Sequence, residues 1–327
     1  MKIERISCPC CTKAAAALWN KYAEVEFPHR KLDEEAFVAM FVTETEGVKK
    51  INLLARDEDG NLLGWANGAL KDSNDIGYIT FVLVEKDARR KGIARALLKE
   101  LEAALAAEKE LSKYQIIFFN PVALTWIVPG SDGHDHPNAP GIDVASDAYI
   151  FFKNNGYLDN VFQNSFYLPL ENFQIKPDVQ ARIDALPQYD LSITFYDPAK
   201  HHGMAELFED LGSEDWRSIV MGNIAREDGG DPVIIAVHNG KAVGFTGPIH
   251  VQESGRGYFA GIGVHSEYRK YGLGKALFST LCKSLKEIGA GYMTLFTGET
   301  NPARYIYQSA GFKIVKTWSD MDKIIKK

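Results

Sequence analysis

The chain repeats itself, with residue n matching residue n + 180, and this repeat constrains its fold more than any other feature. The residues that match at this interval include Gly60 with Gly240, Gly64 with Gly244, Tyr78 with Tyr258, and Val84 with Val264. Unrelated sequence would not keep one interval through successive strands, turns and loops. A length of 327 residues also exceeds what one small core organises. We therefore expect two domains of the same fold that arose by tandem duplication.

Each half is expected to place the same elements in the same order. Apolar periodicity predicts helices at residues 18–22, 34–41 and 205–211. It predicts strands at 51–55, 62–69 and 78–84 in the first half, and at 233–237, 242–246 and 258–264 in the second. A helix with one apolar face follows in each half, and then a strand at 115–119 or 292–296. A short helix at 178–186 is predicted in the polar connector between the halves.

A short basic loop that contains glycine precedes the amphipathic helix in both halves. It reads Arg-Arg-Lys-Gly-Ile-Ala-Arg at residues 89–95 and Arg-Lys-Tyr-Gly-Leu-Gly-Lys at 269–275. The first turn of a helix presents unpaired N–H groups, and Arg and Lys add positive charge, so each loop suits a pyrophosphate. The second loop lacks the Walker A pattern, because Ala276 follows Lys275. It also lacks the dinucleotide fingerprint, because Leu277 stands where a third glycine belongs.

The pattern that remains is Arg-x-x-Gly-x-Gly in the second loop and Arg-x-x-Gly-x-Ala in the first. It resembles the acetyl-CoA signature of the GNAT superfamily of N-acetyltransferases. The stretch NPARYIYQSAGFKIV at residues 301–315 resembles the late motif of that superfamily, and SDAYIFFKNNGYL fills the same place from residue 146. The resemblance implies two tandem GNAT domains of the α+β / α/β class, each a mixed, mostly antiparallel sheet flanked by helices.

The resemblance also implies acetyl-CoA as co-substrate, held between the fourth and fifth strands of a domain, and no metal. The residues expected to bind it in the second half are Ile262, Val264, Arg269, Lys270, Tyr271, Gly272, Leu273, Gly274, Lys275 and Asn301. Those expected to bind it in the first half are Val82, Val84, Arg89, Arg90, Lys91, Gly92, Ile93, Ala94 and Arg95.

The implied chemistry is direct attack of an amine on the thioester, which needs a base for the amine and a proton for the departing thiolate. Tyr307 is expected to supply that proton, because a phenol is an uncharged donor. Phe152 stands at the matching position of the first half and cannot donate. We therefore expect the second half to catalyse and the first half to be degenerate in catalysis, although its loop still suits acetyl-CoA.

The base is less well defined. Glu253 and His250, near the end of a predicted strand, are the leading candidates, ahead of Glu299 and His265, and solvated surface positions are the alternative for each. The whole chain has a second interpretation, a non-catalytic protein that binds or senses acyl-CoA without an acceptor site. Tyr307 and the complete Gly-x-Gly loop favour the enzyme, with a small amine or a peptide N-terminus as acceptor.

The first half carries an insertion. Gly311 matches Gly156 at an interval of 155 rather than 180, which places extra residues at about 121–146. The expected domains are 1–168 and 191–327, joined by a linker at 169–190. Loops of this length in compact domains are usually functional or disordered. Trp126 and Ile127 favour a loop that packs down.

The insertion also contains His134, Asp135 and His136, which are residue types that ligate metals. No partner cluster accompanies them, so a polar loop is the favoured interpretation. Three of the four cysteines stand at Cys8, Cys10 and Cys11. Their spacing does not match a structural zinc site with paired ligands elsewhere, so reduced thiols of minor structural importance are expected.

Charge and composition narrow the partners. The net charge of −6 argues against a nucleic-acid-binding face, which requires a broad basic surface. No apolar run is long enough to span a bilayer, and the N-terminus lacks the apolar stretch of a signal peptide. We therefore expect a cytoplasmic enzyme with no membrane partner, either a monomer or a homodimer.

Overall fold

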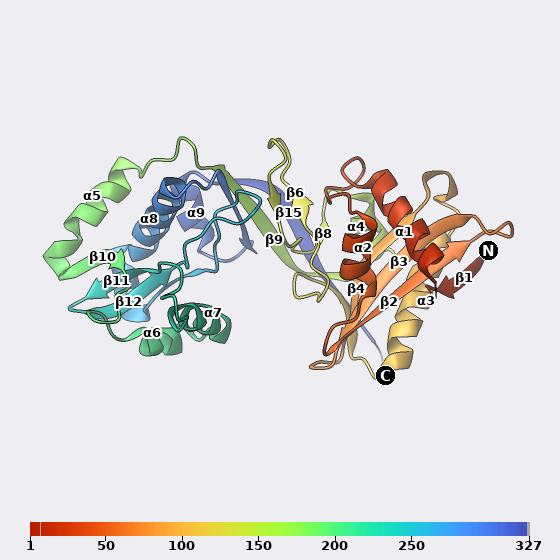
Figure 1. Ribbon diagram of the computed structural model, residues 1–327, viewed down its shortest axis with the longest axis horizontal. Coiled ribbons are helices and arrows are strands. Elements are labelled where there is room, and N and C mark those ends of the chain that lie inside the picture. Colours follow the sequence, from red (N-terminus) through yellow and green to blue (C-terminus); the bar gives the residue numbers. More distant parts are fainter. Residues whose placement is uncertain (7, 326–327) are drawn as a thin grey trace. The chain divides into compact units, whose positions relative to one another are not determined.

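The computed structural model describes residues 1–6 and 8–325, which divide into two compact units (Figure 1). The first unit comprises Met1–Asn164 together with the C-terminal segment from Lys316, and the second comprises Ser165–Val315. Both units contain mostly antiparallel strands with helices on both faces, so the expected fold class is confirmed. Within the described residues, no helix has the length and apolar character needed to cross a membrane.

The first unit has a sheet that runs β1 (Lys2–Arg5), β2 (Val48–Arg56), β3 (Leu62–Lys71), β4 (Ile76–Val84), β5 (Lys113–Ile116) and β15 (Lys313–Ile324). Neighbours are antiparallel except β4 and β5. Helix α3 (Ile93–Glu108) covers one face through Leu97, Leu101 and Leu105, whose spacing defines an apolar stripe. Helices α1 (Pro9–Tyr22) and α2 (Glu34–Phe37), with the π-helical turn η1 (Val38–Val42), cover the other face around Trp65.

The second unit has an antiparallel sheet in the order β10 (Leu191–Phe195), β11 (Ile234–His238), β12 (Lys241–Thr246) and β13 (Ile262–Val264). Helix α8 (Leu273–Glu287) packs on one face through Leu277, Leu281 and Leu285. Helices α6 (Met204–Leu211) and α7 (Glu214–Ile224) pack on the other face. Burial of each such leucine contributes about 1.5–3 kcal/mol, so both faces of the sheet are stabilised. Strand β14 (Tyr292–Gly298) and helix α9 (Arg304–Ala310) complete the unit.

The sequence repeat persists as a packing repeat. A Cβ atom on Gly64 in β3 would lie 3.0 Å from Cδ1 of Leu97 in α3. A Cβ atom on Gly244 in β12 would lie 3.0 Å from Cδ1 of Leu277 in α8. In each unit, therefore, the amphipathic helix approaches one strand so closely that only glycine fits without a shift.

The last strands depart from the domain ranges expected from the sequence. Strand β15 belongs to the first unit from Lys316 onward, where Met321 pairs with Ile116 of β5. Strand β9 (Leu158–Pro169) begins in the first unit, and its residues from Ser165 belong to the second, which also holds its neighbour β14. The alternating pattern of a strand identifies its buried face but not its partner strand. For this reason the end of the chain was expected to belong to the second domain, at 191–327.

The connector expected at 169–190 is part of the second unit. The predicted helix is present as α5 (Pro177–Ala185) and is followed by the 3₁₀ turn η3 (Leu186–Tyr189). Leu170 and Leu186 are fully buried in the core beneath α8, and Val179 of α5 is buried as well. Burial of these side chains fixes the segment against the domain that follows it.

The insertion is packed, as Trp126 and Ile127 predicted. It contains the short strands β6 (Trp126–Ile127), β7 (Asp135–His136) and β8 (Ile142–Asp143), and helix α4 (Asp147–Lys153) follows it. Trp126 is completely buried, with its ring 5.1 Å from that of Trp318. His136 stacks on Trp126, and Asp135 lies 3.2 Å from Arg30, so these two candidate ligands are engaged with the fold of the loop.

Candidate functional site

In both units two parallel strands separate soon after they pair. In the first unit the described pairing of β4 with β5 covers only Ile76–Tyr78. In the second unit a single bridge joins Arg256 to Tyr292, and β13 is the last strand of its four-stranded sheet. The outer edge of β13 thus presents backbone groups to which an extended ligand can add as a further strand.

A left-handed glycine begins the helix that follows each of these strands. The 3₁₀ turn η4 (Ser266–Tyr271) leads from β13 to Gly272, which has a φ of +70° and caps α8. Gly92 caps α3 with a φ of +83°. Glycine adopts this conformation without the steric cost that other residues incur. Neither helix has an acidic residue in its first turn, so the positive end of each helix dipole is available to an anion.

The first arginine of each loop is held in the same way but has different surroundings. Arg269 donates through Nε to the carbonyl of Val264 at 3.2 Å, and Arg89 donates through Nε to the carbonyl of Val84 at 3.0 Å. Arg89 is also paired with Glu26 through Nη2 at 2.6 Å. Within the described residues, Arg269 has no carboxylate within ion-pairing distance. The second loop therefore retains more positive charge for a ligand.

A pocket of about 530 Å³ lies beside β13 and the start of α8. Its walls include six of the residues that the sequence predicted, namely Ile262, Val264, Arg269, Gly272, Gly274 and Lys275. The walls also include five that it missed, namely Arg182, Leu211, Trp216, Gly263 and Ile306. Three of the lining residues are cations and none is acidic, so the pocket favours anionic ligands.

The residues that the sequence analysis missed lie on elements for which it predicted no part in ligand binding. Arg182 lies on α5, and its guanidinium covers the glycine turn, because a Cβ atom on Gly272 would sit 2.5 Å from its Nη1. Trp216 of α7 packs against the backbone at Gly261 so closely that a Cβ atom there would lie 2.3 Å from Nε1. Ile306 precedes Tyr307 in the late motif and could have been noticed for that reason.

Four other predicted residues of the second half are absent from the pocket wall. The Lys270 ammonium lies 5.3 Å from the centre of the Tyr271 ring, and Leu273 is buried in the core. Asn301 accepts a hydrogen bond from the backbone N–H of Ala303 at 2.9 Å, which fixes the turn before α9. Any role of these four residues in ligand binding stays a prediction.

Tyr307 lies on α9 and is buried among aromatic rings. Its ring centre is 4.9 Å from that of Phe278, 5.5 Å from that of Phe166 and 6.0 Å from that of Phe259. Burial raises the pKa of the Tyr307 phenol far above its ordinary value of 10, so the hydroxyl stays protonated throughout the neutral range. No other described residue forms a hydrogen bond with this hydroxyl, which leaves its proton available for donation.

The two leading base candidates have different surroundings. His250 has its Nδ1 3.2 Å from Oδ2 of Asp231, and its ring stacks on Tyr258 with a centroid distance of 4.3 Å. Glu253 is exposed in a tight turn. A general base has to be held in one position, and His250 is held by its stack on Tyr258, since its Nδ1 makes no hydrogen bond in spite of the short distance to Asp231.

The first unit carries the equivalent loop with less free charge and without the phenol. Phe152, which the sequence repeat matches to Tyr307, is buried against Tyr157. Asn120 donates through Nδ2 to Ile79 and Thr80 of β4, beside the point where β4 and β5 separate. The remaining predicted residues of this half are Val82 and Val84 in β4, the exposed Arg90, Lys91 and Arg95, and Ile93 and Ala94 at the start of α3.

Comparison with solved structures supports the tandem architecture. One match is a GCN5-related glucosamine N-acetyltransferase region of a fungal multi-domain GH3 β-N-acetylglucosaminidase. The TM-score is 0.67 and the sequence identity is 16%. The aligned region covers 98% of this chain and 38% of the longer enzyme. The structure also matches a tandem GNAT protein from the clavulanic acid biosynthesis pathway with a TM-score of 0.60 and 16% identity, over 100% of this chain and 99% of that one. A GCN5-related N-acetyltransferase from Sphaerobacter thermophilus matches with a TM-score of 0.60 and 14% identity, over 100% and 96% of the two chains.

Comparison of sequences identifies the family. No curated protein sequence matches this chain significantly. The sequence profile of the Acetyltransferase (GNAT) family matches twice, at residues 13–122 and 189–312, which together make up well over half of the chain. Each match contains one of the glycine loops and one of the separating strand pairs. The chain therefore belongs to the GNAT acetyltransferase family, whose members transfer acyl groups from acyl-CoA to amine acceptors.

Proposed function

We propose that the second unit transfers an acetyl group from acetyl-CoA to an amine by direct attack of the amine on the thioester. The observation that carries this proposal is the pocket beside β13, where Arg182, Arg269 and Lys275 surround the left-handed Gly272 at the start of α8. The diphosphate of the coenzyme binds at the helix start. Its pantetheine arm adds to the open edge of β13 at Ile262–Val264.

The reaction needs three proton transfers besides the attack itself, and His250 returns its proton to solvent before the next turnover. The ammonium form of the acceptor first loses a proton to His250, and Asp231 stabilises the charge that the imidazole gains. The amine nitrogen then bonds to the carbonyl carbon, and the bond between that carbon and sulfur breaks. The departing sulfur takes the proton of the Tyr307 hydroxyl, and Tyr307 regains a proton from the attacking nitrogen by way of solvent. The products are the N-acetylated acceptor and free CoA.

Tyr307 suits the role of acid because its raised pKa keeps it protonated at neutral pH. It follows Ile306, which lines the pocket. The acceptor is a small amine or a peptide N-terminus that enters from the side of α6 and α7, where Leu211 and Trp216 form part of the pocket wall. Apolar walls suit the neutral amine that attacks, because they disfavour the ammonium form.

The first unit has a different role in this proposal. Its loop binds acetyl-CoA more weakly, since Glu26 neutralises Arg89, and its site is inactive because Phe152 has no proton to donate. The chain thus contains one productive and one non-productive coenzyme site. The acidic Glu26 is the feature that distinguishes the two loops most clearly.

Replacement of Tyr307 by Phe tests the assignment. Because the ring packing is retained and only the hydroxyl is lost, we expect kcat to fall about 100-fold, in the range of general acid catalysis, with little change in the KM for acetyl-CoA. Tyr305→Phe is the matched control, since Tyr305 lies on the same helix but is 64% exposed. The readout is release of free CoA with a panel of amines.

Two results would contradict the proposal. Equal turnover of the Tyr307→Phe and Tyr305→Phe variants would show that the acid or the unit is wrong. Binding of acetyl-CoA by the unmodified chain with no CoA release for any amine would favour the alternative, a protein that binds or senses acyl-CoA.

A further inference from the structure

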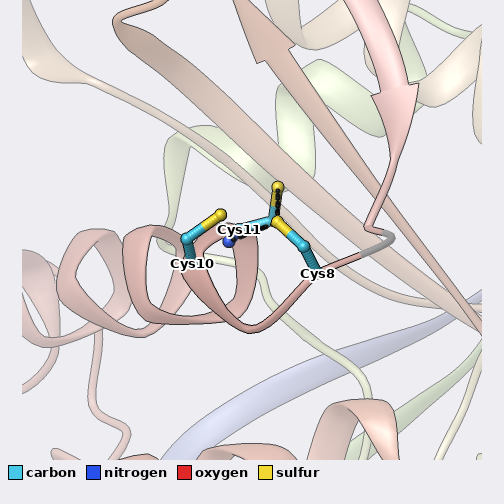
Figure 2. A group of neighbouring side chains, drawn as sticks. All are labelled: Cys8, Cys10 and Cys11. Atoms are coloured by element: carbon cyan, nitrogen blue, oxygen red, sulfur yellow. Dashed lines mark hydrogen bonds between the residues drawn. The ribbon is translucent and has the colours of Figure 1, made fainter.

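Three thiols meet at the start of helix α1, on the first unit. The sulfur atoms of Cys8, Cys10 and Cys11 all lie within 4.8 Å of one another (Figure 2). The Cys8 thiol donates to Sγ of Cys11 at 2.9 Å, and Sγ of Cys8 accepts from the backbone N–H of Cys11 at 3.3 Å. The fourth cysteine, Cys282, is buried in α8 of the second unit.

The local sequence explains why the sulfurs converge. Cys8 is the N-cap, with extended backbone angles of φ −148° and ψ 157°, and Pro9 begins the helix. The fixed φ of proline favours a helix start at this position. Cys8 thus occupies the N-cap, and Cys10 and Cys11 are the two residues after Pro9. The three cysteine side chains lie around the same end of the helix. Capping alone would favour Ser, Thr, Asp or Asn, so it does not account for three thiols.

Positively polarised groups lie beside the cluster. No acidic residue occupies the first turn of α1, so the partial positive charge of the helix start faces the thiols. The guanidinium of Arg56 in β2 approaches Cys11, with Nη2 3.7 Å from Sγ. Arg56 also pairs with Glu4, with 3.2 Å between Nε and the carboxylate oxygen, which holds the guanidinium in position and offsets part of its charge. Thiolates, rather than thiols, are the form in which cysteine ligates metals.

The geometry suits a three-coordinate ion. Metal–sulfur bonds of about 2.3 Å place three sulfurs roughly 4 Å apart around one centre. Small side-chain rotations would bring the three cysteine sulfurs from their present separations to this distance. Among the described residues, no carboxylate or imidazole joins the group as a fourth ligand. Cys11 is buried, Cys8 is half-buried and Cys10 is exposed, so an ion can enter from one side. Soft thiolate ligands without a fourth protein ligand favour Cu(I), a soft ion that accepts low coordination numbers.

We propose that Cys8, Cys10 and Cys11 form a binding site for one Cu(I) ion, held by three thiolates. Binding releases the three thiol protons and involves no change of oxidation state. This proposal differs from the expectation that these are reduced thiols of minor structural importance. A structural zinc site would require a second pair of ligands elsewhere in the chain, whereas the fold brings Cys10 beside the pair formed by Cys8 and Cys11.

The test is a titration of the full, reduced chain with Cu(I) under anaerobic conditions, against a coloured Cu(I) chelator as competitor. We expect one ion per chain and, by X-ray absorption, three sulfur neighbours at about 2.3 Å. Cys10→Ser should weaken the affinity by about 100-fold or more, because it removes one ligand. Cys282→Ala is the matched control and should bind Cu(I) like the unmodified chain. Circular dichroism shows whether each variant retains its fold.

Several outcomes would overturn the proposal. Equal affinity of the unmodified chain and Cys10→Ser would exclude Cys10 as a ligand, and loss of binding in Cys282→Ala would place the ion elsewhere. Two sulfur neighbours instead of three would show that only the Cys8 and Cys11 pair binds. A double variant, Cys8→Ser with Cys11→Ser, keeps a hydroxyl cap on α1 and should abolish binding even if Cys10→Ser were to perturb the helix start.

Discussion

Arg269 donates a hydrogen bond through its Nε to the carbonyl of Val264, at 3.2 Å, and so fixes the guanidinium at the end of β13. Arg269 lines the pocket beside Gly272, and within the described residues its guanidinium has no carboxylate partner. Arginine in this position can contact two phosphate oxygens at once. The same bond between Arg89 and Val84 in the first unit leaves a guanidinium that is paired with Glu26.

Loss of the Arg269 side chain should weaken coenzyme binding more than it affects chemistry. We expect Arg269→Ala to raise the KM for acetyl-CoA about 10-fold, equivalent to about 1.4 kcal/mol, with kcat nearly unchanged. Arg89→Ala is the matched control and should leave steady-state kinetics unaltered. With S-acetylpantetheine, which lacks the diphosphate, both variants should behave like the unmodified enzyme. A 10-fold loss with this shorter donor would argue against a phosphate contact.

Glu26 should limit coenzyme binding by the first unit. Replacement by Gln removes the negative charge that pairs with Arg89, so we expect the weaker of two acetyl-CoA sites to gain affinity several-fold. Calorimetric titration of the unmodified chain and of Glu26→Gln measures both sites. Glu35→Gln is the control, since Glu35 is exposed on α2. A single acetyl-CoA site in the unmodified chain and in Glu26→Gln would show that the first loop does not bind the coenzyme.

The sequence repeat predicted the fold well because it reported packing that both units share. The glycines at 64 and 244 lie beneath Leu97 and Leu277 in the same way, and this contact depends on residues that are local to each half. The glycine loops were equally predictable, since a left-handed residue at a helix start leaves a sequence signal in the form of Gly92 or Gly272.

What the sequence could not provide depends on contacts between distant segments. Nothing in the alternating pattern of β15 indicates that Met321 pairs with Ile116, some two hundred positions earlier. Arg182 could not be predicted as a site residue either, because its sequence indicates only a polar connector. Its contact with Gly272 depends on how α5 packs in the fold. Likewise, the spacing of Cys8, Cys10 and Cys11 gave no measure of how closely their sulfurs meet around a helix end.

Comparison of Gly272→Ala with Gly92→Ala should distinguish the effect of backbone strain from an effect on ligand binding. Gly272→Ala and Gly92→Ala both force a left-handed residue, so each should lower the free energy of unfolding by about 1 kcal/mol. Only at residue 272 does the added carbon meet Arg182, at 2.5 Å from Nη1, whereas nothing lies within 4 Å at residue 92. We therefore expect Gly272→Ala alone to weaken acetyl-CoA binding, measured by calorimetry beside thermal unfolding. Equal affinity of the two variants would exclude a role for this turn in the productive site.

Asp320 of β15 is a buried carboxyl whose ionisation opposes folding of the first unit. It is 2% exposed, and its Oδ1 has no hydrogen-bond partner among the described residues. Burial raises the pKa of this carboxyl from 3.8 to about 7, against the effect of a hydrogen bond from Gln163, and the charge of Asp322 raises it further. The folded chain thus holds a proton here between about pH 4 and pH 7 that the unfolded chain has lost.

The stability that this proton provides should fall progressively as the pH rises from about 4 to about 7, and none of it should remain above that pH. The pKa difference of about three units corresponds to at most about 4 kcal/mol between pH 4 and pH 8. Asp320→Asn keeps the shape and the acceptor for Gln163 but cannot ionise, so its melting temperature should exceed that of the unmodified chain at pH 8 and approach it at pH 5. Asp59→Asn, in an exposed turn, is the control for a change of net charge. Parallel melting curves for Asp320→Asn and the unmodified chain across this range would mean that Asp320 is already ionised in the folded protein.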